Sequence, residues 1–256
     1  MVGLVPAGGR ASRVAPLPLS KELYPVGFRD LGGVPRPVVA CEDLLRAMAG
    51  AGAEAVYVVL GDAKWDIPAY LGDGAQLGLD LAYLTISRSP GVPHSVDRAH
   101  AYVRDATVLF GFPDIVFTDH DALLRLRRRL TANDADAVLG LLPAERPESA
   151  DLVDVGDDGR VRRIRVKPSE ATAGLAWMLA VWGPRVTAHV HERVMATRAP
   201  SPAPGQEGGA LPELHMGTVL QSAVDAGLRV EAERLRGTFT DIGTPAGLYR
   251  AVRGAV

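Results

Sequence analysis

The hydrophobic pattern of the first half of the chain alternates between short apolar runs and longer segments with helical spacing. Continuous β-branched runs are typical of parallel strands that are covered on both faces. They predict strands within residues 1–9, 54–61, 106–112 and 135–144. Apolar positions three and four apart predict helices within 37–50, 94–103 and 119–130, and residues 67–86 predict a short helix, a Gly/Asp loop and a further strand.

The pattern changes after residue 150. Residues 151–168 predict a hairpin that turns at Asp157-Asp158-Gly159, and 174–184 form another apolar strand. Residues 196–212 are rich in Pro, Gly, Ala and Ser and predict an exposed loop. A helix over 216–227, a strand over 228–235 and a last helix over 245–253 complete the chain.

This alternation of strands and helices predicts an α/β fold with a mostly parallel, Rossmann-like central sheet flanked by helices. The second half adds small β excursions to that sheet. The length of 256 residues fits one domain over 1–256.

Composition excludes several classes of protein. The formal charge of −2 provides no basic field for nucleic acid or a membrane surface, and no apolar run is long enough to span a bilayer. Cys41 is the single cysteine, so the chain has no internal disulfide and no CxxC site. The start lacks a signal-peptide pattern, and we expect a cytoplasmic protein.

A glycine loop follows the first predicted strand. Gly8 and Gly9 fit neither the Walker A pattern nor the GxGxxG fingerprint, and a plain turn is the simplest alternative. A plain turn leaves unexplained why Arg13 and Lys21 follow so closely. Glycine backbone N–H groups next to two cations are instead typical of a phosphate-binding loop. Lysine is otherwise rare: the chain has only Lys21, Lys64 and Lys167.

The loop begins a set of motifs that resembles a known family. In order along the chain they are "PAGGRASRVAPLPLSKELYPVG", "YLGDGAQLGLDLAYL", "SPGVPHSVDRAHAYV", "VLFGFPDIVF", "VKPSEATAGLAWMLAVW" and "TFTDIGTPAGLYRA". This set is similar to the signature of the sugar-1-phosphate nucleotidyltransferases, the group that contains glucose-1-phosphate thymidylyltransferase. The resemblance implies their fold, with a nucleotide-binding half over 1–150 and a sugar-phosphate-binding half over 151–256.

The resemblance also implies a reaction and its partners. A sugar-1-phosphate, or a related cyclitol or unusual sugar phosphate, attacks the α-phosphorus of a nucleoside triphosphate and displaces pyrophosphate, with Mg²⁺ as cofactor. No covalent intermediate with the protein is needed, so catalysis depends on positioning and charge neutralisation. Relatives commonly form homodimers or tetramers, and we expect a homo-oligomer.

The resemblance assigns roles residue by residue. Arg13 and Lys21 are the expected catalytic cations, Arg13 on the triphosphate and Lys21 on the α-phosphate. The alternative without a function is a surface cation for Arg13 and a solvated strand-edge residue for Lys21. The expected nucleotide contacts are Ala7, Gly8, Gly9, Gly91 and His94.

Two aspartates are the expected metal ligands. Asp114 and Asp241 each follow a predicted strand, and paired carboxylates suit octahedral Mg²⁺. Alternatively, Asp114 caps a turn after Pro113 and Asp241 forms an Asx-turn before Gly243. Lys167 and Gly174 are the expected sugar-phosphate contacts.

The chain departs from the family pattern at two positions. Val166 stands where the family has a Glu that binds sugar hydroxyls, which leaves the acceptor open. His94 stands where thymidylyltransferase-like members read the base with Gln, and a histidine cannot present the paired donor and acceptor of an amide. The base is therefore open as well.

Two other functions remain as alternatives. One is cytidylyl transfer to a non-sugar phosphate such as phosphocholine; the other is a catalytically silent homologue that binds nucleotide-sugar. His189 and His191 have no acidic or cysteine partner at metal-ligand spacing. Trp177, Trp182 and Cys41 fit a buried core better than a site, and the "RLRRRL" segment fits the solvated face of a helix.

Overall fold

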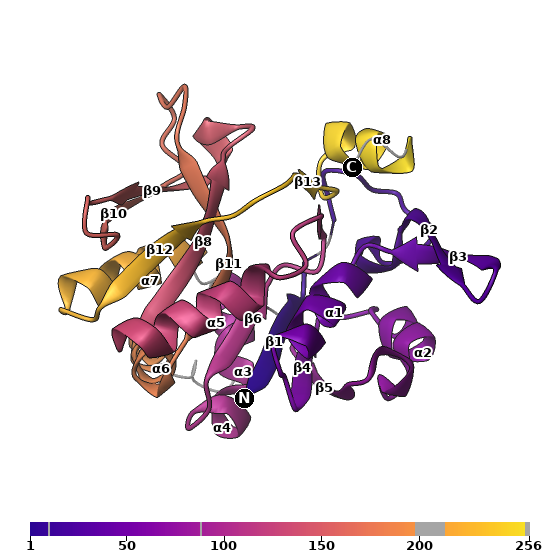
Figure 1. Ribbon diagram of the computed structural model, residues 1–256, viewed down its shortest axis with the longest axis horizontal. Helices are drawn as coiled ribbons and strands as arrows, with labels where there is room; N and C mark the ends of the chain where they lie inside the picture. The colour runs from indigo at the N-terminus through magenta and orange to yellow at the C-terminus, as the bar shows by residue number, and fades with distance from the viewer. Residues whose placement is uncertain (10, 88, 198–212, 254–256) are drawn as a thin grey trace, which may run out of the picture.

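The structure is a computed structural model that describes residues 1–9, 11–87, 89–197 and 213–253 (Figure 1). Most of the predicted loop over 196–212 lies outside the described residues. None of the helices in the described ranges combines the length and apolar character that crossing a membrane requires.

A central sheet carries the fold. Its main run consists of β1 (Val2–Ala7), β4 (Ala55–Leu60), β5 (Asp80–Thr85), β6 (Val108–Gly111), β8 (Ala137–Pro143), β11 (Leu175–Trp182) and β12 (Val230–Arg234), and the hairpin over 151–166 joins the same sheet beside β11. The order runs β12, β8, β11, β6, β1, β4, β5. β11 pairs antiparallel with both β6 and β8, whereas the other pairs in this run are parallel. The prediction of a mostly parallel sheet is confirmed.

Helices cover both faces of this sheet (Figure 1). On one face, α1 (Glu42–Gly50), α2 (Asp66–Leu71) and α5 (Ala122–Asn133) share a hydrophobic cluster with alternate strand residues such as Val5 and Leu109. On the other face, α3 (Val92–Arg98), α4 (His100–Val103), α6 (Pro184–Thr197) and α7 (Met216–Asp225) pack on Leu4 and Phe110. Burial on both faces explains why the strand sequences are continuous apolar runs.

Smaller elements attach to this core. β9 (Asp151–Val155) and β10 (Val161–Val166) form the predicted antiparallel hairpin. β7 (Ile115–Phe117) pairs with β13 (Phe239–Asp241), and α8 (Pro245–Val252) is the predicted last helix. Trp182 and Cys41 are buried, as expected. The division of the chain near residue 150 stays a prediction.

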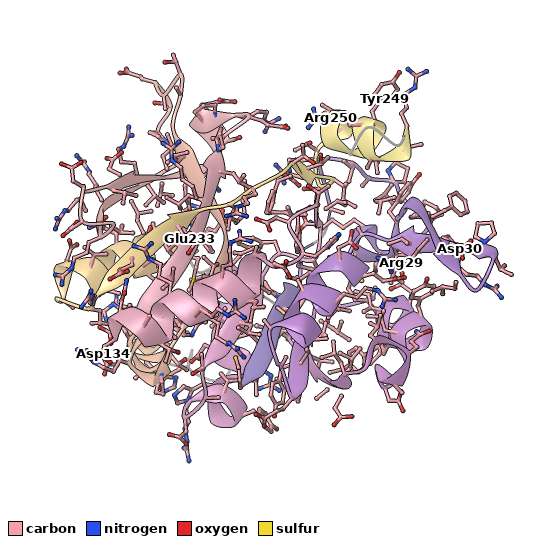
Figure 2. The ribbon with its side chains drawn as sticks, in the orientation of Figure 1. Arg29, Asp30, Asp134, Glu233, Tyr249 and Arg250 are labelled. Carbon is pink, nitrogen blue, oxygen red and sulfur yellow. The ribbon has the colours of Figure 1, made fainter. Side chains whose placement is uncertain are left out.

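Two local expectations differ from the structure. The helix expected over 37–50 begins only at Glu42, because β3 (Val34–Val39) pairs with β2 (Pro25–Leu31) across the Gly32-Gly33 turn, where both glycines have positive φ. Arg29 of β2 reaches the start of α1, where it donates to Glu42 and Asp43 (Figure 2). The sequence analysis did not predict α6, whose first helical residue is a proline.

We expected the basic side chains of α5 to be exposed to solvent, but some of them form ion pairs with neighbouring elements. Arg125 donates two hydrogen bonds to the Asp119 carboxylate, at 2.9 and 2.6 Å, and a third to Glu233 on β12. The backbone N–H of Arg236 also donates to Asp119. Burial works to raise the pKa of Asp119, but these hydrogen bonds prevail and the pKa is lowered. Asp119 thus ties α5 to the segment that follows β12.

We predict that Asp119→Asn lowers the free energy of unfolding by about 2 kcal/mol at pH 7, the usual contribution of hydrogen bonds to a charged group. Because the folded pKa lies below the ordinary value, the charge stabilises the fold above about pH 4 and this contribution disappears as the pH falls through the folded pKa. Urea unfolding at pH 7 and pH 3 measures both effects. Asp105→Asn is the control, because Asp105 and Arg104 form an exposed pair of little expected weight; equal effects of the two variants at pH 7 would contradict the prediction.

Candidate functional site

The candidate site lies where the parallel strands end. Because β1, β4, β5 and β6 are parallel, the segments after them meet at one edge of the sheet. A cavity of about 760 Å³ opens there and is lined by residues that follow β1, β4 and β5, including Gly8, Gly9, Lys21, Gly61, Lys64 and Ser89. A Cβ on Gly61 would lie 2.7 Å from the carbonyl oxygen of Gly8, so the two loops can approach this closely only through glycine.

Lys21 and Asp114 form an ion pair beside this cavity. Lys21 begins the short 3₁₀ turn Lys21–Leu23, and Asp114 follows β6. Lys21 Nζ donates to Asp114 Oδ2, and the two side chains are only 13% and 14% exposed. Burial works to lower the pKa of Lys21, but the charge and hydrogen bond of Asp114 outweigh it and the pKa is raised. Lys21 therefore keeps its positive charge in a largely buried position.

Asp241 joins the pair from a distant part of the chain. It lies on β13 opposite Ile115 of β7, and the backbone N–H of Ile242 donates to the Asp114 carbonyl at 3.0 Å. Burial raises the pKa of Asp241, and the neighbouring negative charge of Asp114 adds to the effect. The guanidinium of Arg13 lies 3.8 Å from Asp241 Oδ2 and is half-exposed. The structure thus brings together four residues that the sequence analysis singled out.

Gly243 lies in the middle of this group. A Cβ there would be 2.9 Å from Asp241 Oδ1, 3.0 Å from Asp114 Oδ2 and 3.3 Å from Arg13 Nη2. The Gly243 N–H also donates to Asp241 Oδ1 at 2.8 Å, so the Asx-turn considered for Asp241 is present. Asp241 Oδ2 faces Arg13. Two carboxylates beside a position that glycine leaves open offer the oxygen ligands that a hard divalent cation such as Mg²⁺ prefers.

Only some of the expected nucleotide contacts line the cavity. Gly8 and Gly9 line the cavity, and Ala7 is the buried last residue of β1. Gly91 packs against the backbone of Leu214 with a positive φ. His94 is buried in α3, and its Nε2 lies 3.4 Å from the Thr197 hydroxyl at the end of α6. Neither of the last two belongs to the described cavity lining, and their roles stay predictions.

The sequence analysis missed two polar residues. Lys64 lines the cavity and forms an ion pair with the buried Glu22, Nζ to Oε2 at 2.6 Å. Burial raises the pKa of Glu22, although Lys64 opposes this. The rarity of lysine was the available signal for Lys64. The second missed residue is Asp151, in the other half of the chain.

Asp151 stands directly across the β9–β10 ladder from Val166. Its Oδ2 accepts the backbone N–H of Gly217 at 3.2 Å. Burial raises the pKa of Asp151, while electrostatic interactions with His215 and Lys167 oppose the shift. Asp151 therefore supplies a carboxylate next to the position where the family's glutamate is replaced by Val166. The register shift between Val161 and Arg163 places Asp151 opposite Val166, and counting residues from the turn would not have indicated it.

The expected sugar-phosphate contacts flank this carboxylate. Lys167 follows β10 with a positive φ of 42°, and its N–H donates to the Ala150 carbonyl at 3.1 Å. The carbonyl of Gly174, just before β11, accepts the N–H of Ala144. Their roles toward a substrate stay predictions.

A glycine loop, two cations and two carboxylates meet at the carboxyl edge of an α/β sheet, which is where proteins of the doubly wound class bind their ligands. The nucleotidyl transferase family model matches residues 2–255. Glucose-1-phosphate thymidylyltransferase of Streptomyces antibioticus is 28% identical over 99% of this chain and 65% of that protein. Low-salt glycan biosynthesis nucleotidyltransferase Agl11 of Haloferax volcanii is 25% identical over 98% of this chain and 65% of that protein.

The chain therefore belongs to the nucleotidyl transferase family. It spans 65% of the length of each of these two relatives. A crystal structure of UDP-glucose pyrophosphorylase complexed with UDP-glucose superposes with a TM-score of 0.76 at 16% identity, covering 99% of this chain and 97% of that one. This likeness shows the shared fold.

We predict that Gly243→Ala weakens the binding of Mn²⁺, used as a spectroscopic substitute for Mg²⁺, by about tenfold or more, as displaced metal ligands do. The added methyl group would push the two carboxylates and Arg13 apart. Electron paramagnetic resonance titration measures the affinity. Gly27→Ala is the matched control, because a Cβ at Gly27 meets nothing within 4 Å; if the two variants bind Mn²⁺ equally well, the assigned metal position is wrong.

Proposed function

We propose that the protein is a Mg²⁺-dependent nucleotidyltransferase that condenses a nucleoside triphosphate with a sugar-1-phosphate or a related phosphate. An oxygen of the acceptor phosphate attacks the α-phosphorus, the bond from the α-phosphorus to the bridging oxygen breaks, and pyrophosphate leaves. The observation that carries the proposal is the convergence of Arg13 and Lys21 on Asp114 and Asp241 at the mouth of the glycine-lined cavity.

The arrangement is suited to a reaction between two polyanions. Backbone N–H groups of the Gly8–Gly9 loop line the cavity and can approach phosphate oxygens. Lys21 adjoins the same loop, since a Cβ on Gly9 would lie 3.8 Å from its Nζ. The lysine is positioned to neutralise charge on the α-phosphate, where charge develops during displacement. Arg13, which is more exposed, is positioned for the departing pyrophosphate.

Asp114 and Asp241 would hold the cation. When bound, Mg²⁺ supplies further charge neutralisation for the phosphate oxygens. Burial raises the pKa of Asp241, and the nearby charge of Asp114 raises it further; a divalent cation would relieve the repulsion between the two carboxylates. Lys21 offsets part of that repulsion through its ion pair with Asp114.

The acceptor is expected on the side of the second half of the chain. Asp151, Lys167 and His215 lie close enough there for their charges to interact. A cation beside a carboxylate can bind a phosphate and a hydroxyl group of the same molecule. In this proposal Asp151 takes over hydroxyl recognition from the missing glutamate, which supports an acceptor that carries hydroxyl groups.

The test is a panel of nucleoside triphosphates against sugar-1-phosphates, a cyclitol phosphate and phosphocholine, with pyrophosphate release as the measurement. We expect release with at least one hydroxyl-bearing sugar or cyclitol phosphate, and its loss when EDTA removes the metal. Asp114→Asn is the control for release by a contaminating enzyme, because this variant should be inactive.

Two outcomes would contradict the proposal. Tight binding of a nucleotide-sugar without release from any pair would identify a catalytically silent binder. Release from CTP and phosphocholine alone would identify cytidylyl transfer to a non-sugar phosphate.

A further inference from the structure

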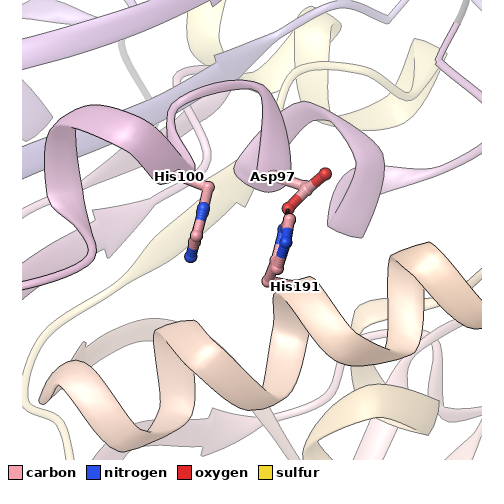
Figure 3. A group of neighbouring side chains, drawn as sticks. All are labelled: Asp97, His100 and His191. Atoms are coloured by element: carbon pink, nitrogen blue, oxygen red, sulfur yellow. Dashed lines mark hydrogen bonds and ion pairs between the residues drawn. The ribbon is translucent and has the colours of Figure 1, made fainter.

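Three side chains with metal-binding chemistry meet on the helical face formed by α3, α4 and α6. They are Asp97 on α3, His100 at the start of α4 and His191 on α6. Figure 3 shows His191 directed toward the other two across the space between the helices. His191 and Asp97 are 94 residues apart in sequence, so the spacing of histidines along the chain could not reveal this partner.

The geometry of the group is compact. His191 Nδ1 lies 2.6 Å from Asp97 Oδ1, and the rings of His100 and His191 stack in parallel with centroids 3.8 Å apart. One ligand atom from each of the three residues lies within 4.8 Å of the others. The Asp97 side chain is only 5% exposed, whereas His191 remains partly open to solvent. A buried carboxylate and two imidazoles thus point into one place that an ion can reach.

A simple ion pair explains only part of this arrangement. Asp97 and His191 alone would form a hydrogen-bonded pair, and His100 would add nothing to it. The stacked ring of His100 instead places a second imidazole beside the pair, where two positive charges would repel each other. Two neutral imidazoles and one carboxylate are compatible with each other when a divalent cation lies between them.

We propose that Asp97, His100 and His191 form a binding site for a divalent transition metal of the zinc class, separate from the site of nucleotidyl transfer. Two nitrogen ligands and one oxygen ligand suit Zn²⁺ and its neighbours, whereas Mg²⁺ prefers oxygen alone. Zinc holds such ligands at about 2.0–2.2 Å. On metal binding, the hydrogen bond between His191 and Asp97 would be replaced by a bond from each residue to the ion, and a water molecule would complete four-coordination.

The site would link parts of the chain that are far apart in sequence. α3 and α4 come from the segment between β5 and β6, and α6 follows β11. α3 borders the cavity through Ser95, whose hydroxyl lies 2.8 Å from that of Ser89, a cavity-lining residue. A metal that ties α3 to α6 would therefore hold one wall of this cavity in place.

The test is a titration of the chelator-treated protein with Co²⁺, in excess Mg²⁺ so that the carboxylate pair of the other site is occupied. Co²⁺ reports imidazole coordination through its visible absorption bands. We expect one Co²⁺ per chain, displacement by Zn²⁺, a rise in Tm on binding, and an affinity lowered by about tenfold or more in His100→Ala and in His191→Ala.

Matched controls separate this site from others. His189→Ala removes a histidine of the same helix, which is hydrogen-bonded to Ser222, and should bind Co²⁺ like the wild type. Asp114→Asn alters the proposed catalytic carboxylates and should also leave Co²⁺ binding unchanged. Circular dichroism of His100→Ala and His191→Ala shows whether lost binding reflects lost folding.

Three results would overturn the proposal. The first is a wild-type protein that binds no Co²⁺ in excess Mg²⁺. The second is equal binding by the wild type and by folded His100→Ala and His191→Ala. The third is binding that Asp114→Asn abolishes, which would place the cobalt in the other site. Because each readout is binding, none depends on whether nucleotidyl transfer is observed.

Discussion

The ion pair between Lys21 and Asp114 is the interaction on which the candidate site depends. It joins the loop after the first strand to the end of β6, in a position where both side chains are largely buried. Burial alone would favour a neutral lysine, but Asp114 keeps the amine protonated. Removing one partner of a buried pair costs about 3–5 kcal/mol, so the pair also resists rearrangement. The protein thereby maintains a fixed positive charge where two phosphate substrates would meet.

The scaffold explains how the other groups reach this pair. Parallel strands bring the loops after β1, β4, β5 and β6 to one edge, and helices on both faces bury the sheet that holds them. The short β7–β13 ladder then adds Asp241 from near the end of the chain. Gly243 leaves room between the carboxylates that any side chain would fill. The pairing of backbone strands thus sets the positions of the site residues. The few side chains that it brings together set the charge of the site.

The sequence was most informative where chemistry is local. The apolar runs predicted the sheet, and the motifs "VLFGFPDIVF" and "TFTDIGT" predicted Asp114 and Asp241 as site residues, which the structure places side by side. Long-range pairing limited the rest. Asp151 lies near Lys167 and His215 because of the register of the β9–β10 hairpin, and no sequence motif predicts that register. Asp97 and His191 meet only because α3 and α6 pack together, and α6 itself was not predicted. Residues whose partners depend on packing cannot be paired from one sequence.

The most direct measurement of the central claim compares turnover and nucleotide affinity in Lys21→Ala. If Lys21 neutralises charge that develops in the transition state, kcat falls by about 100-fold or more while the Kd for the nucleoside triphosphate rises by less than about tenfold. A melting curve confirms that the variant remains folded. Equal losses in kcat and in affinity would contradict the account, because they would show that Lys21 only helps to bind the ground-state substrate.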